Sequence, residues 1–149
     1  ILMMLIGGSP GSTAGGMKTT TIAVLILNAF ATFGREPETE VFGRRFDNTV
    51  VKNAATIAIL YFFLFFTGGI AISQIEHAAL SDCLFETASA VGTAGLTLGI
   101  TTELGLVSHL ILVVLMYLGR VGGLTLIYAA ISVKIQSGAK RPLDKITVG

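Results

Sequence analysis

Small and polar residues gather in the run Glu86–Thr97 (ETASAVGTAGLT), which lies between two long apolar segments. Gly92 and Gly95 permit backbone conformations that other residues rarely adopt. Their small neighbours, Thr93 and Ala94, would let backbone carbonyl oxygens line a narrow passage, and such oxygens can replace the water around a dehydrated cation. Taken alone, the run is more typical of an ordinary glycine turn between two buried helices. The rest of the chain favours the cation passage.

A second glycine-rich segment, Gly7–Gly16 (GGSPGSTAGG), precedes Met17 and Lys18. It resembles a phosphate-binding loop, but that motif needs Lys directly after its second glycine, and here Met17 intervenes. No buried strand precedes it, so the sequence argues against nucleotide binding. Non-helical backbone at membrane depth is tolerated where it lines a cavity. We therefore expect this segment to obstruct the pathway below an ion filter.

Two charged residues lie in apolar surroundings. Arg120 falls inside a long apolar run, where a guanidinium is costly unless it faces protein, water or a carboxylate. It marks either an ion pathway or a buried pair that fixes helix packing, and Gly119, Gly122 and Gly123 beside it permit close approach of another backbone. For Glu86 we expect hydrogen bonds within the surroundings of its helix rather than direct ion ligation.

Two apolar segments must position these residues. The chain is 52% hydrophobic and 13% charged, with a mean hydropathy of +0.80, whereas soluble domains carry roughly 25% charged residues. The run 53–75 contains no Asp, Glu, Lys or Arg, and the run 104–133 contains only Arg120. Both are long enough to cross a hydrocarbon core of about 30 Å. The sequence predicts an all-α membrane protein.

The basic residues place the two sides of the membrane. Lys and Arg precede the first span and follow the second, but none lies between 74 and 104. That intervening loop carries four acidic residues: Glu76, Asp82, Glu86 and Glu103. By the positive-inside rule, both flanks lie in the cytoplasm and the loop lies outside.

The order of elements predicts four regions. Residues 1–33 hold the end of a broken membrane helix, the glycine-rich loop and a following helix, and residues 34–49 form a polar cytoplasmic linker. Residues 50–135 read as span, re-entrant pore helix near Ser81–Val91, filter loop and span, which is one membrane-pore-membrane repeat. Residues 136–149 form a cytoplasmic tail. Because the chain begins inside an apolar run, we expect its first helix to be cut.

The pore-helix candidate has a favourable electrostatic arrangement. If it ends near Val91, the negative end of its dipole faces the backbone that follows and favours a cation there. Asp82 lies near the opposite end, where a carboxylate is favourable. Cys83 is expected to pack as a small apolar residue, and His77 and His109 are expected to be packing or interface residues. We expect no resident cofactor.

Five segments together resemble the Trk/Ktr/HKT superfamily of potassium transporters, most closely the Ktr-type membrane subunit of bacterial potassium uptake. They are GGSPGSTAGGMKTTT, VFGRR, ETASAVGTAGLTLGIT, MYLGRVGGLT and KITVG. In that family one polypeptide contains four membrane-pore-membrane repeats around one pore. The resemblance implies that this chain holds the end of the third repeat and all of the fourth.

The resemblance also implies residue roles. Gly95 matches the filter glycine, and Arg120 matches the arginine that faces the obstructing loop. The implied potassium filter comprises Val91, Gly92, Thr93, Ala94 and Gly95. The implied gating loop comprises Gly7, Gly8, Ser9, Gly11, Ser12, Thr13, Ala14, Gly15, Gly16 and Lys18. Gly149, at the carboxyl terminus, would contribute to docking on a partner.

What the family does sets the expected function and partners. The resemblance implies channel-like potassium uptake across the bacterial plasma membrane, often promoted by sodium, by a multi-pass protein with a cytoplasmic carboxyl terminus. It implies a homodimer of membrane subunits on a cytosolic nucleotide-binding gating ring, with the missing repeats of the same polypeptide as nearest neighbours. Two alternatives remain open. The chain could be a complete small cation channel subunit that assembles as a tetramer, or a non-conducting membrane scaffold.

Overall fold

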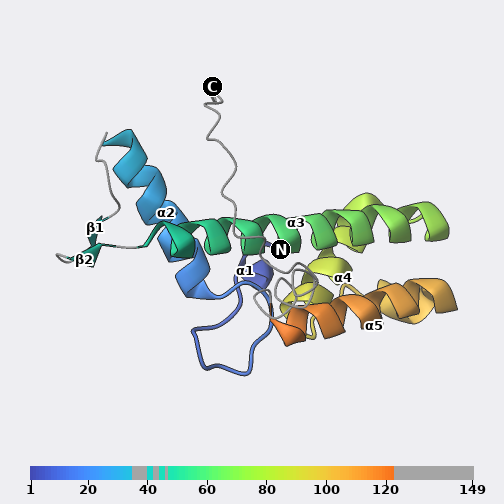
Figure 1. The fold of residues 1–149 in the computed structure, drawn as a ribbon. Coiled ribbons are helices and arrows are strands. Elements are labelled where there is room, and N and C mark those ends of the chain that lie inside the picture. The colour runs from blue at the N-terminus through green and yellow to red at the C-terminus, as the bar shows by residue number, and fades with distance from the viewer. Residues whose placement is uncertain (35–39, 42–43, 46, 123–149) are drawn as a thin grey trace, which may run out of the picture.

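The computed structural model describes residues 1–34, 40–41, 44–45 and 47–122, which form helices joined by loops, together with one very short pair of strands (Figure 1). The predicted end of the second span beyond residue 122, the tail 136–149 and Gly149 lie outside these residues. The elements in order are α1 Leu2–Leu5, α2 Thr19–Phe33, β1 Glu40–Val41, β2 Arg44–Arg45, α3 Asn48–Glu76, α4 Leu80–Gly92, the 3-10 helix η1 Ile100–Glu103 and α5 Leu106–Val121. β1 and β2 pair antiparallel within the predicted linker.

Helix α3 is the longest element. It begins after Asp47, whose carboxylate accepts a hydrogen bond from the Thr49 N–H at 3.1 Å and so caps the first turn. Its 29 residues extend about 44 Å. Among the described residues, it is the one helix long and apolar enough to cross a membrane, and α2 and α5 are shorter apolar helices.

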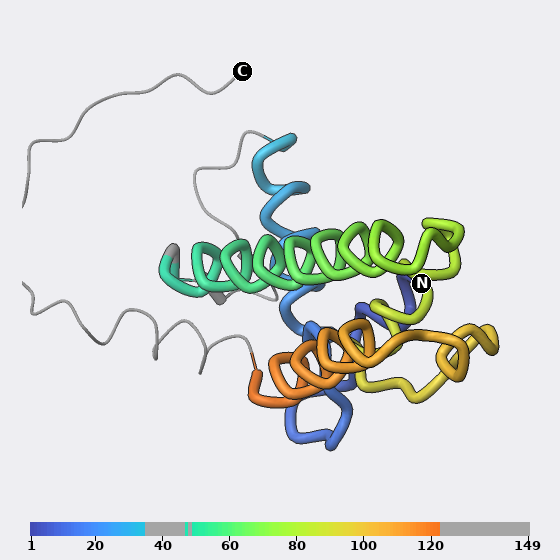
Figure 2. The backbone as a smooth tube through the Cα atoms, turned by 90° about the vertical axis from the view of Figure 1, so that its right-hand side faces the viewer, coloured from blue at the N-terminus to red at the C-terminus, as the bar shows by residue number. Residues whose placement is uncertain are grey.

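Helices α3 and α5 run antiparallel (Figure 2). The Glu76 carboxylate, at the end of α3, accepts a hydrogen bond from the Ser108 hydroxyl near the start of α5. In the middle of α3, the Tyr61 hydroxyl donates to the Gly119 carbonyl oxygen near the end of α5 at 3.3 Å. These two contacts fix the register along most of the length of α5.

The segment between α3 and α5 starts and finishes at the same end of this helix pair. Helix α4, of 13 residues, reaches from that end only to the level of Gly119, where its Val91 carbonyl lies against α5. The chain then leads back through η1 to Gly105, whose N–H donates to Glu76 at 2.8 Å. Helix α4 is one residue longer at each end than the predicted Ser81–Val91. The sequence did not predict η1.

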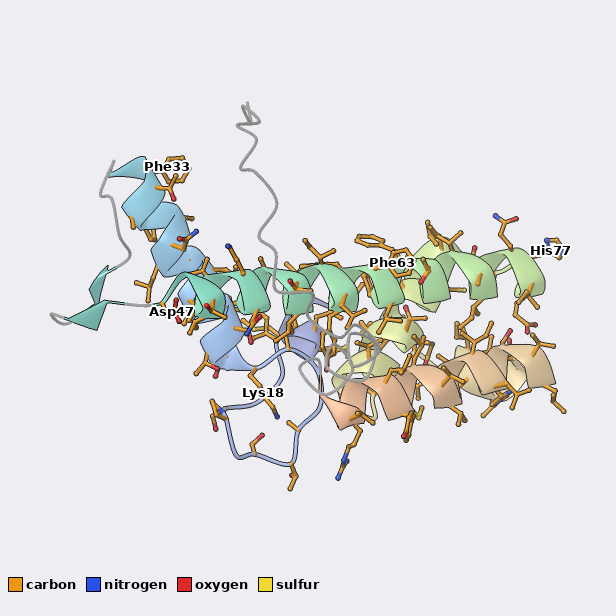
Figure 3. All side chains as sticks on the ribbon, in the orientation of Figure 1. Lys18, Phe33, Asp47, Phe63 and His77 are labelled. Carbon is orange, nitrogen blue, oxygen red and sulfur yellow. The ribbon has the colours of Figure 1, made fainter. Side chains whose placement is uncertain are left out.

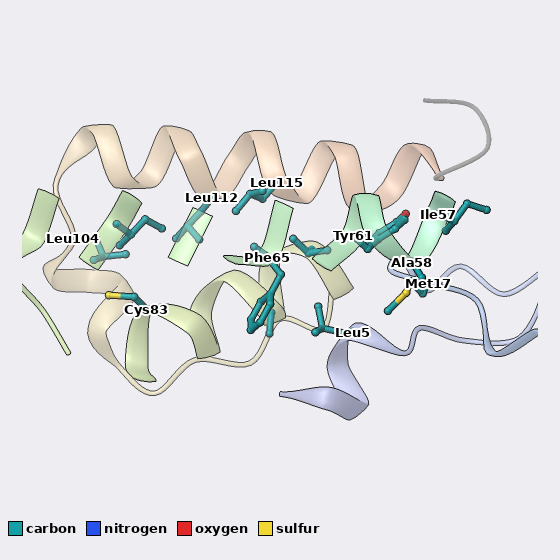
Figure 4. Packing of buried hydrophobic residues seen from close by; sticks show 14 residues of the cluster. Leu5, Met17, Ile57, Ala58, Tyr61, Phe65, Cys83, Leu104, Leu112 and Leu115 are labelled. Atoms are coloured by element: carbon teal, nitrogen blue, oxygen red, sulfur yellow. The ribbon is translucent and has the colours of Figure 1, made fainter. Parts of the chain in front are cut away.

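The hydrophobic core lies where α3, α4 and α5 meet (Figure 4). Cys83 is fully buried there, as expected of a small packing residue. Two residues from the amino-terminal segment, Leu5 and Met17, complete the cluster and are each 1% exposed. The amino-terminal segment is therefore anchored against α4 rather than lying apart from it. By contrast, Phe63 on α3 and Phe33 on α2 are exposed on the surface (Figure 3).

Candidate functional site

Helix α4 ends in a left-handed residue that turns the chain into the loop. Thr93 has φ 51° and ψ 36°, and its N–H donates to the Ala90 carbonyl oxygen at 3.1 Å. A residue other than glycine in this conformation is uncommon. The carboxyl end of α4, with the partial negative charge of its dipole, therefore faces the backbone that follows, while Asp82 lies in the first turn at the opposite end.

Two predicted filter residues lie in the helix rather than in the loop. Val91 and Gly92 form the buried last turn of α4. Gly92 does not use the conformational freedom that glycine permits, since its φ is not positive. Glycine is needed there because a Cβ would overlap the carbonyl oxygen of Met4, which belongs to α1. Gly95 does adopt the expected conformation, with φ 74°.

The loop after α4 is tied to that helix through alternate backbone amides. The Ala94 N–H donates to the Ser89 carbonyl oxygen at 2.9 Å, and the Leu96 N–H donates to the Ser89 hydroxyl at 2.8 Å. The Leu98 N–H donates to Glu86 Oε1 at 3.0 Å. These hydrogen bonds hold the loop along α4.

The carbonyl oxygens of the same loop remain available. Within the part of the chain that the structure describes, no donor is bonded to a carbonyl oxygen of residues 94–98, and all five residues are exposed. Apart from Gly95 itself and its two chain neighbours, no described atom lies within 4 Å of the position that a Cβ of Gly95 would occupy. Uncommitted carbonyl oxygens beside open space are the ligands that a dehydrated cation requires.

The glycine-rich loop from Gly7 to Lys18 is closed at its base and braced from within. Ile6 and Met17 form a parallel bridge, with the Met17 N–H donating to the Leu5 carbonyl oxygen at 3.1 Å. Lys18 Nζ donates to the carbonyl oxygens of Ala14 at 2.7 Å and Ser12 at 3.4 Å. Figure 3 shows Lys18 pointing into the ring of the loop. The predicted non-helical segment is thus a constrained structure.

This loop touches the end of α4 and α5. The Gly15 N–H donates to the Thr93 hydroxyl oxygen at 2.8 Å, and the Gly16 N–H donates to the Gly119 carbonyl oxygen at 3.2 Å. The structure therefore brings together two predicted sites that lie far apart in the sequence. Gly119 is the meeting point, because its carbonyl oxygen also accepts the Tyr61 hydroxyl.

Arg120 lines a pocket with residues of the predicted filter. The pocket has a volume of about 400 Å³ and is formed by Ser89, Thr93, Gly95, Met116, Tyr117 and Arg120. Arg120 is exposed, and no carboxylate among the described residues pairs with it. Both predicted alternatives for Arg120, an ion pathway and a helix-packing pair, stay predictions. The guanidinium puts a positive charge near the backbone that would hold a cation.

Glu86 is 4% exposed and accepts three hydrogen bonds from the chain that follows the predicted filter. The donors are the Thr97 hydroxyl at 2.5 Å, the Leu98 N–H at 3.0 Å and the Thr101 hydroxyl at 2.7 Å. The prediction that this carboxylate bonds within the surroundings of its helix is confirmed. Its partners Thr97 and Thr101 were not predicted, although the density of Ser and Thr around an apolar-flanked Glu was a usable signal.

Comparison with known proteins identifies the family. Residues 1–139 match the family model TrkH, described as cation transport protein. The chain belongs to the TrkH family of cation transport proteins. It is therefore a membrane protein of a family that transports cations rather than catalysing a covalent reaction. The expected relationship to the Trk/Ktr group is confirmed.

Two relatives match this chain over its full length. The potassium/sodium uptake protein NtpJ of Enterococcus hirae is 34% identical over 155 residues, and the Ktr system potassium uptake protein B of Bacillus subtilis is 34% identical over 149 residues. The match covers 100% of this chain but only 34% and 33% of those proteins. The protein of the same name from Vibrio alginolyticus is 39% identical over 130 residues, covering 86% of this chain and 28% of its own. The chain thus spans about a third of the length of its curated relatives.

Proposed function

We propose that this chain forms one wall of the potassium-conducting pore of a Ktr-type membrane subunit. The observation that carries the proposal is the loop 94–98, whose alternate amides are bound to α4 while its carbonyl oxygens face no described donor. The relatives' names add the ion, since they are called potassium or potassium/sodium uptake proteins. In this proposal, potassium passes the carbonyl oxygens near Gly95 without covalent chemistry.

The proposal assigns a part to each element. Helices α3 and α5 are the two spans of the repeat, α4 is its re-entrant pore helix, and the Gly7–Lys18 loop is the obstruction below the filter. Arg120 faces the pathway between filter and loop. Three further walls come from the remaining two thirds of a polypeptide of the relatives' length. We place the loop 93–105 outside and the carboxyl terminus, including Gly149, in the cytoplasm.

Assembly follows from the same reading. The complete membrane subunit forms a homodimer and docks on a cytosolic nucleotide-binding ring, which gates flow and to which Gly149 contributes. Sodium promotes potassium uptake, and flow is downhill and channel-like. The length of the relatives favours this reading over a small channel that assembles from four copies of the chain, and potassium uptake by the complete polypeptide separates it from a non-conducting scaffold.

The test replaces Gly95 by alanine in the complete transporter polypeptide, expressed in cells that lack other potassium uptake. Because Gly95 has φ 74°, a side chain there strains the filter backbone, and we expect lower discrimination between potassium and sodium. Gly122→Ala is the matched control, since Gly122 also has a positive φ, 87°, and, apart from its chain neighbours, no described atom within 4 Å of an added Cβ. Unchanged discrimination in Gly95→Ala at normal membrane abundance contradicts the proposal, as does an absence of potassium uptake by the unmodified protein.

A further inference from the structure

We propose that Glu86 is the positioning residue that sets the path of the outer part of the filter loop, residues 96–101, and through it the backbone at Gly95. This inference rests on the proposed function, because it concerns how the filter is held. Glu86 would not touch the ion. It acts through the three hydrogen bonds that its carboxylate accepts.

The loop has little else to hold it among the described residues. Residues 94–99 are all exposed, and at neither Gly95 nor Gly99 would an added Cβ have a described atom within 4 Å. Side-chain packing therefore does not fix the path of the loop there. Hydrogen bonds to α4 fix this path instead. Ser89 accepts those from residues 94 and 96, and Glu86 accepts the one from residue 98.

The three donors to Glu86 surround one turn of chain. Thr97 and Leu98 donate to Oε1, and Thr101 donates to Oε2. The Thr97 hydroxyl oxygen also lies 2.9 Å from the Thr101 hydroxyl and accepts the Gly99 N–H at 2.9 Å. Since each hydroxyl already gives its one hydrogen to Glu86, the carboxylate is the centre of this network and both of its oxygens are used. Such networks act as a unit, so removal of their centre should affect every member.

The carboxylate suits this role better than its alternatives. All three partners donate, and an ionised carboxylate offers only acceptors, which gives charge-assisted bonds. Glutamine has the same shape but only one side-chain oxygen. That oxygen can still accept from Thr97 and Leu98, whereas the amide NH2 in place of Oε2 would donate, so the Thr101 hydroxyl would have to accept instead. Alanine removes the entire centre. If Glu86 positions the loop by hydrogen bonds, the discrimination between potassium and sodium should therefore fall in steps, from glutamate through glutamine to alanine.

The effect on the ion arises from geometry. Leu96 is the residue after Gly95, and its N–H is bound to Ser89 while Leu98 is bound to Glu86. If the outer anchor is lost, the peptide units beyond Gly95 can rotate, and the carbonyl oxygens no longer present one fixed arrangement. Discrimination between cations depends on the number and placement of these oxygens. We expect Glu86→Ala to change the potassium-to-sodium ratio more than the amount of folded protein.

The experiment uses the complete transporter polypeptide with Glu86→Ala, Glu86→Gln, Thr97→Val and Thr101→Val. Uptake of potassium and of sodium is measured as KM and maximal rate. Loss of charge-assisted bonds predicts a fall in the potassium-to-sodium discrimination ratio of about tenfold for Glu86→Ala and less for Glu86→Gln. Adding Thr97→Val to Glu86→Ala should cause no further loss, because both changes remove the same network. Asp82→Asn is the matched control, a carboxylate on the same helix that bonds only to its neighbour Ser81 among the described residues.

Backbone hydrogen exchange of the same proteins in detergent supplies a readout independent of the ion. Glu86→Ala should raise exchange in the peptide 94–101 and leave α5 unchanged. Unchanged exchange there overturns the anchoring role, and raised exchange with an unaltered discrimination ratio shows that Glu86 is merely structural, which also overturns the proposal. If the unmodified protein moves no potassium, the proposed function fails instead, and the exchange result still decides whether Glu86 holds the loop.

Discussion

The backbone N–H of Gly15 donates to the hydroxyl of Thr93 at 2.8 Å, joining residues that lie 78 positions apart in sequence. Thr93 is also the left-handed residue at which α4 ends and the filter loop begins. One side chain therefore touches both the proposed gate and the proposed filter. Movement of the glycine-rich loop must break this bond or displace the base of the filter.

Thr93→Val tests that connection, because valine keeps the branched shape and removes the acceptor. We expect faster rubidium flux through the complete transporter, since the loop loses one attachment, and a stability loss of about 1 kcal/mol in thermal unfolding. Thr93→Ser keeps the hydroxyl and should behave like the unmodified protein in flux. Equal flux in the valine and serine variants would show that the bond does not restrain the loop.

The sequence predicted the helices well because their signals are local. The apolar run of α3, the break at the glycine-rich loop and the small residues at the end of α4 each depend on neighbouring residues. The close approach that requires glycine at position 92 could not be predicted, because it involves Met4, which lies on another helix. The partners of Glu86 were missed for the same reason, since the loop must first fold back along α4. Contacts of this kind require the packed structure.

Gly119→Ala should destabilise the protein strongly. A Cβ at this position would overlap the carbonyl oxygen of Val91, so α4 and α5 must separate. Overpacking of this kind typically costs about 1–3 kcal/mol. Thermal unfolding of the purified complete transporter measures it. Gly69→Ala, within α3, is the control, because the nearest atom to its Cβ would be Leu84 Cδ2 at 2.5 Å, the end of a flexible side chain rather than backbone. A smaller loss in Gly119→Ala than in Gly69→Ala would contradict the close packing.

Lys18→Met should loosen the glycine-rich loop without unfolding the helices. The ammonium group binds the carbonyl oxygens of Ala14 and Ser12 from inside the ring, and methionine has no donor. We expect faster hydrogen exchange in residues 8–16 and altered rubidium flux. Lys52→Met is the control, since Lys52 is an exposed lysine on α3 outside this loop. Identical exchange in the two variants would mean that backbone contacts alone maintain the ring.

Glu76→Ala should separate the outer ends of α3 and α5. Its carboxylate accepts the Gly105 N–H at 2.8 Å and the Ser108 hydroxyl at 2.5 Å, so it satisfies two groups at the start of α5. Ser108 is fully buried, and its hydroxyl would lose this partner. We expect a loss of about 1–3 kcal/mol in the free energy of unfolding, measured by thermal unfolding of the complete transporter.

Two further variants assign that loss to the contact between the helices. Ser108→Ala removes one donor and should cause a smaller loss, and combining it with Glu76→Ala should cost less than the sum because the two residues share a bond. Glu103→Ala removes an exposed carboxylate from η1 and should leave stability unchanged. Because Glu76 does not contact the filter loop 94–98, the discrimination between potassium and sodium should survive in the protein that remains folded. Additive losses in the double variant would show that Glu76 stabilises α3 by itself rather than joining it to α5.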